Sequence, residues 1–190
     1  MARIAGIGTR DLADAQIDIV EKLGEWIVRC GHELHSGNAQ GSDQAFARGG
    51  NRVDPTKVHL HLPWLSYERQ AIVLGNHVDI LASLDWRIQS RYLDFAAQHH
   101  PAWERVSKGG RMLHARNGRI IYPELLLNRP VDLVIAWPST KLGGGGTGQG
   151  IRMAHAARIP LVDLEQLVFD YLEPPMHELH FLCEQIKEMK

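Results

Sequence analysis

The chain lacks several features that would assign it to a specialised class of protein. It has two cysteines, Cys30 and Cys183, which lie far apart and form no metal-type spacing, so we expect reduced thiols in an intracellular protein. No stretch approaches the ~20 apolar residues of a membrane span, and Asp11 and Asp14 interrupt any apolar run that would open a signal peptide. We therefore expect a cytoplasmic protein with no membrane partner.

An excess of one charge sign is also missing. The 21 Lys and Arg residues are balanced by 22 Asp and Glu residues, and the formal net charge is −1. This balance argues against a strongly basic protein that coats nucleic acid, and it leaves room for a local basic patch.

What the chain does contain is an alternation of strand and helix patterns within 190 residues, a length that suits a single domain. Strands alternating with helices favour an α/β fold with a Rossmann-like central parallel sheet and helices on both faces. We expect one domain over residues 1–190. Its parts are a core at about 1–65 and 129–165, a mostly helical middle insertion at about 66–128, and C-terminal helices at about 165–190.

The strongest local signal is the glycine-rich segment at residues 143–150, which lies between an apolar strand pattern and a helix pattern. Backbone N–H groups and the dipole of the following helix favour an anion there, and glycines let a phosphate approach the backbone. We predict that Gly144, Gly145, Gly146 and Thr147 hold a phosphate; the alternative is a flexible surface loop.

Two further small-residue loops follow predicted strands. Because parallel strands end at one edge of a sheet, these loops are expected to converge on the same ligand. Arg10 is expected to pair with a phosphate or to be an ordinary surface arginine, and Asp43 either caps a helix or accepts a ribose hydroxyl. The predicted binding residues in these loops are Gly8, Thr9, Arg10, Ser36, Gly37, Gln40, Gly41, Ser42 and Asp43.

The middle region adds a polar cluster of His114, Arg116 and Asn117. Asn117 would read a base edge, Arg116 would bind a phosphate, and His114 would act as a general acid or base. The alternative is a solvated loop with a turn at Asn117 and Gly118. If the ligand is cleaved, Glu68 or Asp43 must supply the carboxylate.

Histidines and aromatic residues are less specific signals. Eleven histidines include the pairs His59/His61 and His177/His180, but no third ligand follows either pair at a clear spacing. We therefore expect no metal site, and the sequence indicates no cofactor. Four aromatic residues either stack on bases or belong to the core or a subunit interface: Trp64, Trp86, Trp103 and Tyr92.

These motifs together resemble one superfamily, the SLOG group of Rossmann-like domains. That group includes the DNA-processing protein A (DprA) family and the LONELY GUY (LOG) phosphoribohydrolases. The resemblance spans about residues 4–164 and is strongest to small stand-alone DprA-like proteins. The matching segments are residues 8–10 (GTR), 36–43 (SGNAQGSD), 62–64 (LPW), 100–103 (HPAW), 114–117 (HARN) and 144–152 (GGGTGQGIR).

The resemblance implies binding of a nucleotide, a nucleotide derivative or nucleic acid, and it implies a homodimer. LOG enzymes carry the pattern G-G-x-G-T-x-x-E, in which the glutamate serves cleavage of an N-glycosidic bond. At that position this chain has Gly150, which argues against phosphoribohydrolase activity. A nucleotide-binding protein is the favoured interpretation.

Two alternatives stay open at this point. One is a nucleotide-cleaving hydrolase related to the LOG enzymes. The other is a single-stranded DNA-binding protein of the DprA type, which would use the basic residues of the middle region: Arg87, Arg91, Arg105, Lys108, Arg111, Arg116 and Arg119.

Overall fold

Six parallel strands form the centre of the protein in a computed structural model that describes residues 1–138, 145–166 and 184. Gly144 and most of the expected C-terminal helices, including His177 and His180, lie outside the described residues. The strands are β1 (Arg3–Gly8), β2 (Glu33–Ser36), β3 (Val58–Leu62), β4 (His77–Ile80), β5 (Leu133–Trp137) and β6 (Leu161–Asp163). They lie in the order β4-β3-β2-β1-β5-β6.

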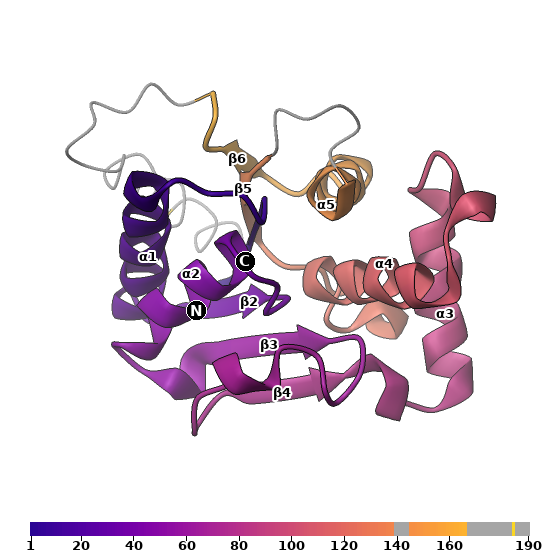
Figure 1. Ribbon diagram of the computed structural model, residues 1–190, viewed down its shortest axis with the longest axis horizontal. Helices are drawn as coiled ribbons and strands as arrows, with labels where there is room; N and C mark the ends of the chain where they lie inside the picture. The colour runs from indigo at the N-terminus through magenta and orange to yellow at the C-terminus, as the bar shows by residue number, and fades with distance from the viewer. Residues whose placement is uncertain (139–144, 167–183, 185–190) are drawn as a thin grey trace.

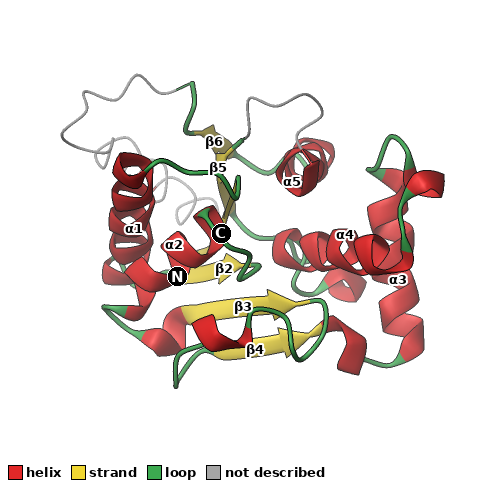
Figure 2. Ribbon diagram, viewed as in Figure 1, coloured by secondary structure: helices red, strands yellow, loops and turns green. Residues whose placement is uncertain are grey.

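Helices cover both faces of this sheet (Figures 1 and 2). The α-helices are α1 (Asp14–Arg29), α2 (Ser42–Asn51), α3 (Trp86–Gln98), α4 (Lys108–Ile121) and α5 (Gly145–Ala156). Short 3-10 turns lie at Pro55–Lys57, Arg69–Ala71, Leu81–Ser83, Trp103–Arg105 and Leu125–Leu127. The predicted Rossmann-like α/β fold is confirmed.

The alternation of side chains along the strands builds two separate cores. Ile4 and Leu133 point to the side that carries α1 and α2, whereas their neighbours Ala5 and Val134 point to the side that carries α3, α4 and α5. On the first side, α1 buries an apolar stripe at helical spacing that includes Leu23. Strands buried on both faces are typical of a parallel sheet.

The structure refines three local expectations. The middle region, expected to be mostly helical, also holds the edge strand β4, which pairs with β3. The proposed turn at Asn117 and Gly118 is absent, because both residues lie inside α4. Gly118 instead allows α3 and α4 to approach, since a Cβ there would lie 3.1 Å from a ring carbon of Phe95. Finally, α5 begins at Gly145, so Gly145, Gly146 and Thr147 form its first turn rather than a loop.

No helix within the described residues is both long enough and apolar enough to cross a membrane.

Candidate functional site

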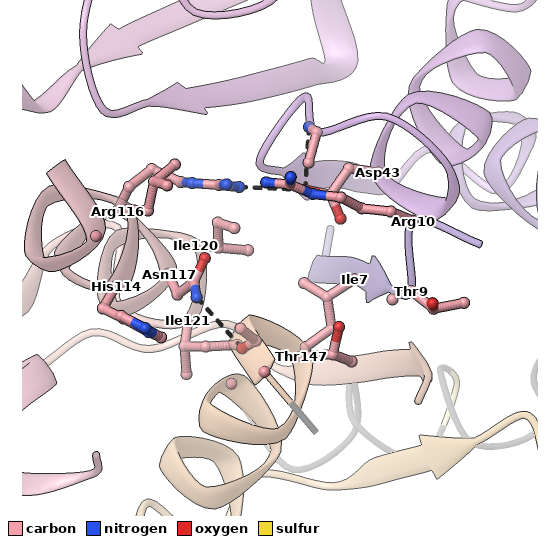
Figure 3. Close-up of a pocket in the computed structure, with 17 residues that line it drawn as sticks. Ile7, Thr9, Arg10, Asp43, His114, Arg116, Asn117, Ile120, Ile121 and Thr147 are labelled. Carbon is pink, nitrogen blue, oxygen red and sulfur yellow. Dashed lines mark hydrogen bonds and ion pairs between the residues drawn. The ribbon is translucent and has the colours of Figure 1, made fainter. Parts of the chain in front are cut away.

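A cavity of about 400 Å³ opens at the carboxyl edge of the sheet (Figure 3). It lies where β1 separates β2 on one side from β5 on the other, which is the point where the strand order reverses. Ligands of open α/β sheets bind in the crevice at this switch point. The lining residues are Ile7, Gly8, Thr9, Arg10, Ala39, Asp43, Gly110, Leu113, His114, Arg116, Asn117, Ile120, Ile121, Gly145, Gly146, Thr147 and Gly150.

The loop after β1 is fixed by backbone contacts. The Thr9 N–H donates to the Trp137 carbonyl at 2.8 Å, and the Thr9 carbonyl accepts hydrogen bonds from the Ser42 N–H at 3.0 Å and the Ser42 hydroxyl at 2.9 Å. Gly8 is required here because a Cβ would lie 2.8 Å from the Trp137 carbonyl oxygen. The rigid loop leaves Arg10 exposed at the cavity, with its guanidinium 3.4 Å from the Tyr67 hydroxyl.

The loop after β2 shapes the site more than it lines it. The buried Ser36 hydroxyl donates to the Gly6 carbonyl at 2.8 Å, which joins β2 to β1. Gly41 adopts a left-handed φ of 82° beside the loop after β1. Gly37 leaves room for an arginine, because a Cβ there would lie 1.2 Å from Arg116 Nη1.

Asp43 and Arg116 form a buried ion pair at the wall of the cavity. Arg116 Nη1 lies 3.1 Å from Asp43 Oδ2, and the two side chains are 5% and 7% exposed. The Ala39 N–H also donates to this carboxylate, at 3.3 Å, and the Arg116 guanidinium packs over the Tyr67 ring. Burial raises the pKa of Asp43, and the charge of Arg116 opposes that shift. Figure 3 shows Arg116 and Arg10 extending toward Asp43 from opposite sides.

The buried side-chain amide of Gln149 determines which ring nitrogen of His114 carries the proton. Gln149 Nε2 donates to the Ala96 carbonyl at 2.9 Å, so its oxygen faces His114 Nδ1 at 2.7 Å and Asn117 Nδ2 at 3.3 Å. His114 must then donate from Nδ1, which leaves Nε2 as the ring nitrogen with a lone pair. Burial lowers the pKa of His114 below its ordinary value, so the imidazole is neutral near pH 7.

The first turn of α5 closes the cavity. Gly145, Gly146 and Thr147 line it, and Asn117 Nδ2 donates to the Gly146 carbonyl at 3.2 Å, which joins α4 to this turn. Free N–H groups at the start of a helix and its dipole favour an anion. Gly150 also lines the cavity, and a Cβ there would lie 2.8 Å from Ile7 Cδ1.

The predicted site residues therefore divide into two groups. The first group lines the cavity: Gly8, Thr9, Arg10, Asp43, His114, Arg116, Asn117, Gly145, Gly146 and Thr147. The second group does not line it: Ser36, Gly37, Gln40, Gly41, Ser42 and Glu68. Glu68 lies in the segment after β3, and its carboxylate accepts a hydrogen bond from Gln70 at 2.8 Å.

Sequence reasoning missed Gln149 and the apolar wall of Ile7, Ile120 and Ile121. Gln149 precedes the buried Met153 by four residues and so shares its helix face, which is the one signal that indicated an inward-facing amide.

Comparisons with known proteins agree with this architecture. No protein-family model matches the chain, and no curated protein matches it by sequence. Solved structures do match. DNA processing protein A from Helicobacter pylori, described for its single-stranded DNA binding mode, has a TM-score of 0.52 at 14% identity, over 99% of this chain and 80% of that one. The structural-genomics target TM1055 has a TM-score of 0.55 at 16% identity, over 97% and 99% of the two chains.

DprA from Streptococcus pneumoniae matches with a TM-score of 0.49 at 14% identity, and the aligned part covers 95% of this chain and 56% of that one. The two higher-scoring neighbours, together with the parallel sheet and its switch-point cavity, establish the fold. The chain therefore has a Rossmann-like α/β fold similar to that of DNA processing protein A.

Proposed function

We propose that this protein binds a nucleotide or a nucleotide derivative in the switch-point cavity, with the phosphate at the first turn of α5. The observation that carries the proposal is the convergence of four segments on one cavity: the loop after β1, the start of α2, the face of α4 and the start of α5. Cavities of this size and position are typical ligand sites of open α/β folds.

The charges of the cavity suit a phosphate. Among the described residues that line the cavity, two arginines, Arg10 and Arg116, face one carboxylate, Asp43, so this lining carries a net positive charge. The planar guanidinium of Arg10 can form two parallel hydrogen bonds with phosphate oxygens. Thr147 adds a hydroxyl donor beside the N–H groups of α5.

The rest of the cavity suits a nucleoside. Ile7, Ile120 and Ile121 form an apolar surface against which a base can pack, and Asn117 and His114 offer polar groups next to it. A mostly apolar lining with a few converging polar groups is the usual composition of a small-molecule site.

The side chains of the cavity favour binding of the nucleotide without its cleavage. Gly150 occupies the position where the LOG pattern has its glutamate, and Ile7 lies next to it. The Asp43 carboxylate is engaged by Arg116 and by the Ala39 N–H, so it is not free to act as a base on a ligand. We therefore expect the ligand to be released unchanged.

The test is isothermal titration of the protein with a panel of nucleoside monophosphates. Loss of a charge-assisted hydrogen bond in Arg10→Gln should weaken binding by about 10-fold or more. The matched control Arg29→Gln, at the far end of α1, should bind like the wild type. Chromatography of the recovered ligand should show no free base. If Arg10→Gln bound the nucleotide as tightly as the wild type, or if a cleaved product were recovered, the proposal would be contradicted.

A second candidate function, single-stranded DNA binding, is favoured by one feature of α3. Trp86 is 69% exposed, Arg87 lies over its ring at 5.6 Å, and exposed Arg91 follows one turn later. Exposed aromatic and basic side chains are the elements of single-strand binding. By contrast, Arg116 and Arg119 of the predicted basic region pair with Asp43 and Asp79.

Filter binding of an oligonucleotide at two salt concentrations tests this candidate. Binding should fall with salt, and Arg87→Gln/Arg91→Gln should reduce the salt dependence while leaving nucleotide affinity unchanged. If the protein did not bind the oligonucleotide at low salt, single-stranded DNA binding would be ruled out as its function.

A further inference from the structure

The face of the sheet that carries α3, α4 and α5 also carries a ladder of histidines, none of which lines the switch-point cavity. The strand register pairs His35 with His59 and His59 with His77. The rings of His35 and His59 stack with centroids 4.5 Å apart, and those of His59 and His77 with centroids 4.6 Å apart.

Three side chains of this face present metal-ligating atoms to one another. One ligand atom each from Glu33, His35 and His59 lies within 4.8 Å of the other two. Ligand atoms around a tetrahedral zinc ion are about 3.3 Å apart, given bonds of ~2.0–2.1 Å. A bound zinc ion would require side-chain rotations that part the stacked rings and bring these atoms to that separation. Glu33 and His59 are only partly buried, which leaves room for such rotations.

A buried ring nitrogen points into this group without a hydrogen bond. His35 Nε2 is inaccessible to solvent and has no hydrogen-bond partner, and its nearest acidic atom is Glu33 Oε2 at 3.7 Å. A buried nitrogen without a partner is unfavourable. A cation between His35 and Glu33 would satisfy both the lone pair and the carboxylate.

The other ring nitrogen of His35 contacts a second histidine. His35 Nδ1 lies 3.0 Å from His61 Nε2, and His61 Nδ1 lies 3.6 Å from Asp79 Oδ2. Asp79 is in turn held by Arg119 at 2.9 Å. A cation bound at His35 Nε2 would place the proton of that ring on Nδ1, from which it would donate to His61 Nε2.

We propose that Glu33, His35 and His59 form a binding site for a divalent transition-metal cation of the zinc class, with water completing the coordination on the side of the exposed His77. Two imidazoles and a carboxylate with an open fourth position form a known zinc ligand set. None of these three residues lines the proposed nucleotide cavity, so the two sites share no ligand-binding residue. This differs from the expectation of no metal site, because the ligands come from neighbouring strands rather than from one stretch of chain.

The experiment titrates tag-free protein, first stripped with a chelator, with Co²⁺ and then with Zn²⁺. The wild type should show the visible absorption of four-coordinate Co²⁺ at one equivalent, and Zn²⁺ should displace it. Loss of a ligand in His59→Gln should weaken binding by more than the ~10–100-fold that loss of an outer partner causes. The matched control His155→Gln, which changes an exposed histidine of α5, should bind like the wild type.

Folding of the variant is checked by thermal unfolding in chelator. There His59→Gln should still unfold cooperatively, and only the wild type and His155→Gln should gain stability from Zn²⁺. Glu33→Gln, at a partly exposed position, provides a second ligand variant with the same expected loss. Absence of one-to-one binding by the wild type, or equal affinity in the wild type and both ligand variants, would overturn the proposal.

Discussion

The buried ion pair of Asp43 and Arg116 should contribute strongly to the stability of the cavity wall. In Arg116→Met the Asp43 carboxylate stays buried and keeps the Ala39 N–H at 3.3 Å but loses the guanidinium. Removal of one partner from a buried ion pair destabilises a protein by about 3–5 kcal/mol. For a chain of this length that corresponds to a fall in Tm of roughly 6–20 °C.

A double-mutant cycle measures the pair directly. Asp43→Asn leaves the Arg116 charge buried without its partner, so this single variant should also lose stability. The double variant Asp43→Asn/Arg116→Met contains neither charge, and its loss should be smaller than the sum of the two single losses by about 0.5–3 kcal/mol.

Urea denaturation of the four proteins, monitored by circular dichroism, supplies the free energies of unfolding. Equal slopes against urea concentration would show that the compactness of the unfolded state has not changed. Additive losses, or a loss below about 1 kcal/mol in Arg116→Met, would refute the argument that a desolvated charge pair supports this wall.

Three further predictions concern residues that form or support the walls of the cavity. Gly37→Ala places a methyl group where Arg116 Nη1 lies, so it should destabilise the wild-type protein by about 1–3 kcal/mol. The same substitution should destabilise the Arg116→Met variant less. Equal shifts of the urea midpoint in the two proteins would contradict this prediction. Gln149→Leu leaves the His114 Nδ1–H without its acceptor and should lower the free energy of unfolding by about 1–3 kcal/mol. An unchanged urea midpoint would show that water replaces the amide. Because burial lowers the pKa of His114, the folded protein binds fewer protons than the unfolded chain near and below about pH 6.5. The free energy of unfolding of the wild type, relative to that of His114→Gln, should therefore fall as the pH is lowered from about 7.5 to 5.5. A difference that does not change with pH would contradict this prediction.

The sequence predicted those parts of the fold in which the local pattern agrees with the tertiary environment. Apolar runs such as Leu133–Trp137 are buried on both faces, so composition alone identified the strand. By contrast β4 alternates His77 and Asp79 with apolar residues, and those polar side chains contact the histidine ladder and Arg119 rather than a core. A strand that is stabilised by such partners carries little apolar signal.

The candidate site shows the same division. Glycine loops that follow strands could be placed at one edge of the sheet by topology alone, and the structure brings Gly8, Arg10 and Thr147 to one cavity. The pairing of Asp43 with Arg116 spans 73 positions and depends on how α4 packs, which periodicity does not encode. The arrangement of the proposed metal ligands on β2 and β3 depends on strand register in the same way.

The most direct test of the account is a crystal structure of the protein grown with a nucleoside monophosphate. The account predicts density for the intact nucleotide in the switch-point cavity, with phosphate oxygens within hydrogen-bond distance of Thr147 and Arg10. A nucleotide ordered elsewhere on the molecule while this cavity holds only solvent would contradict it.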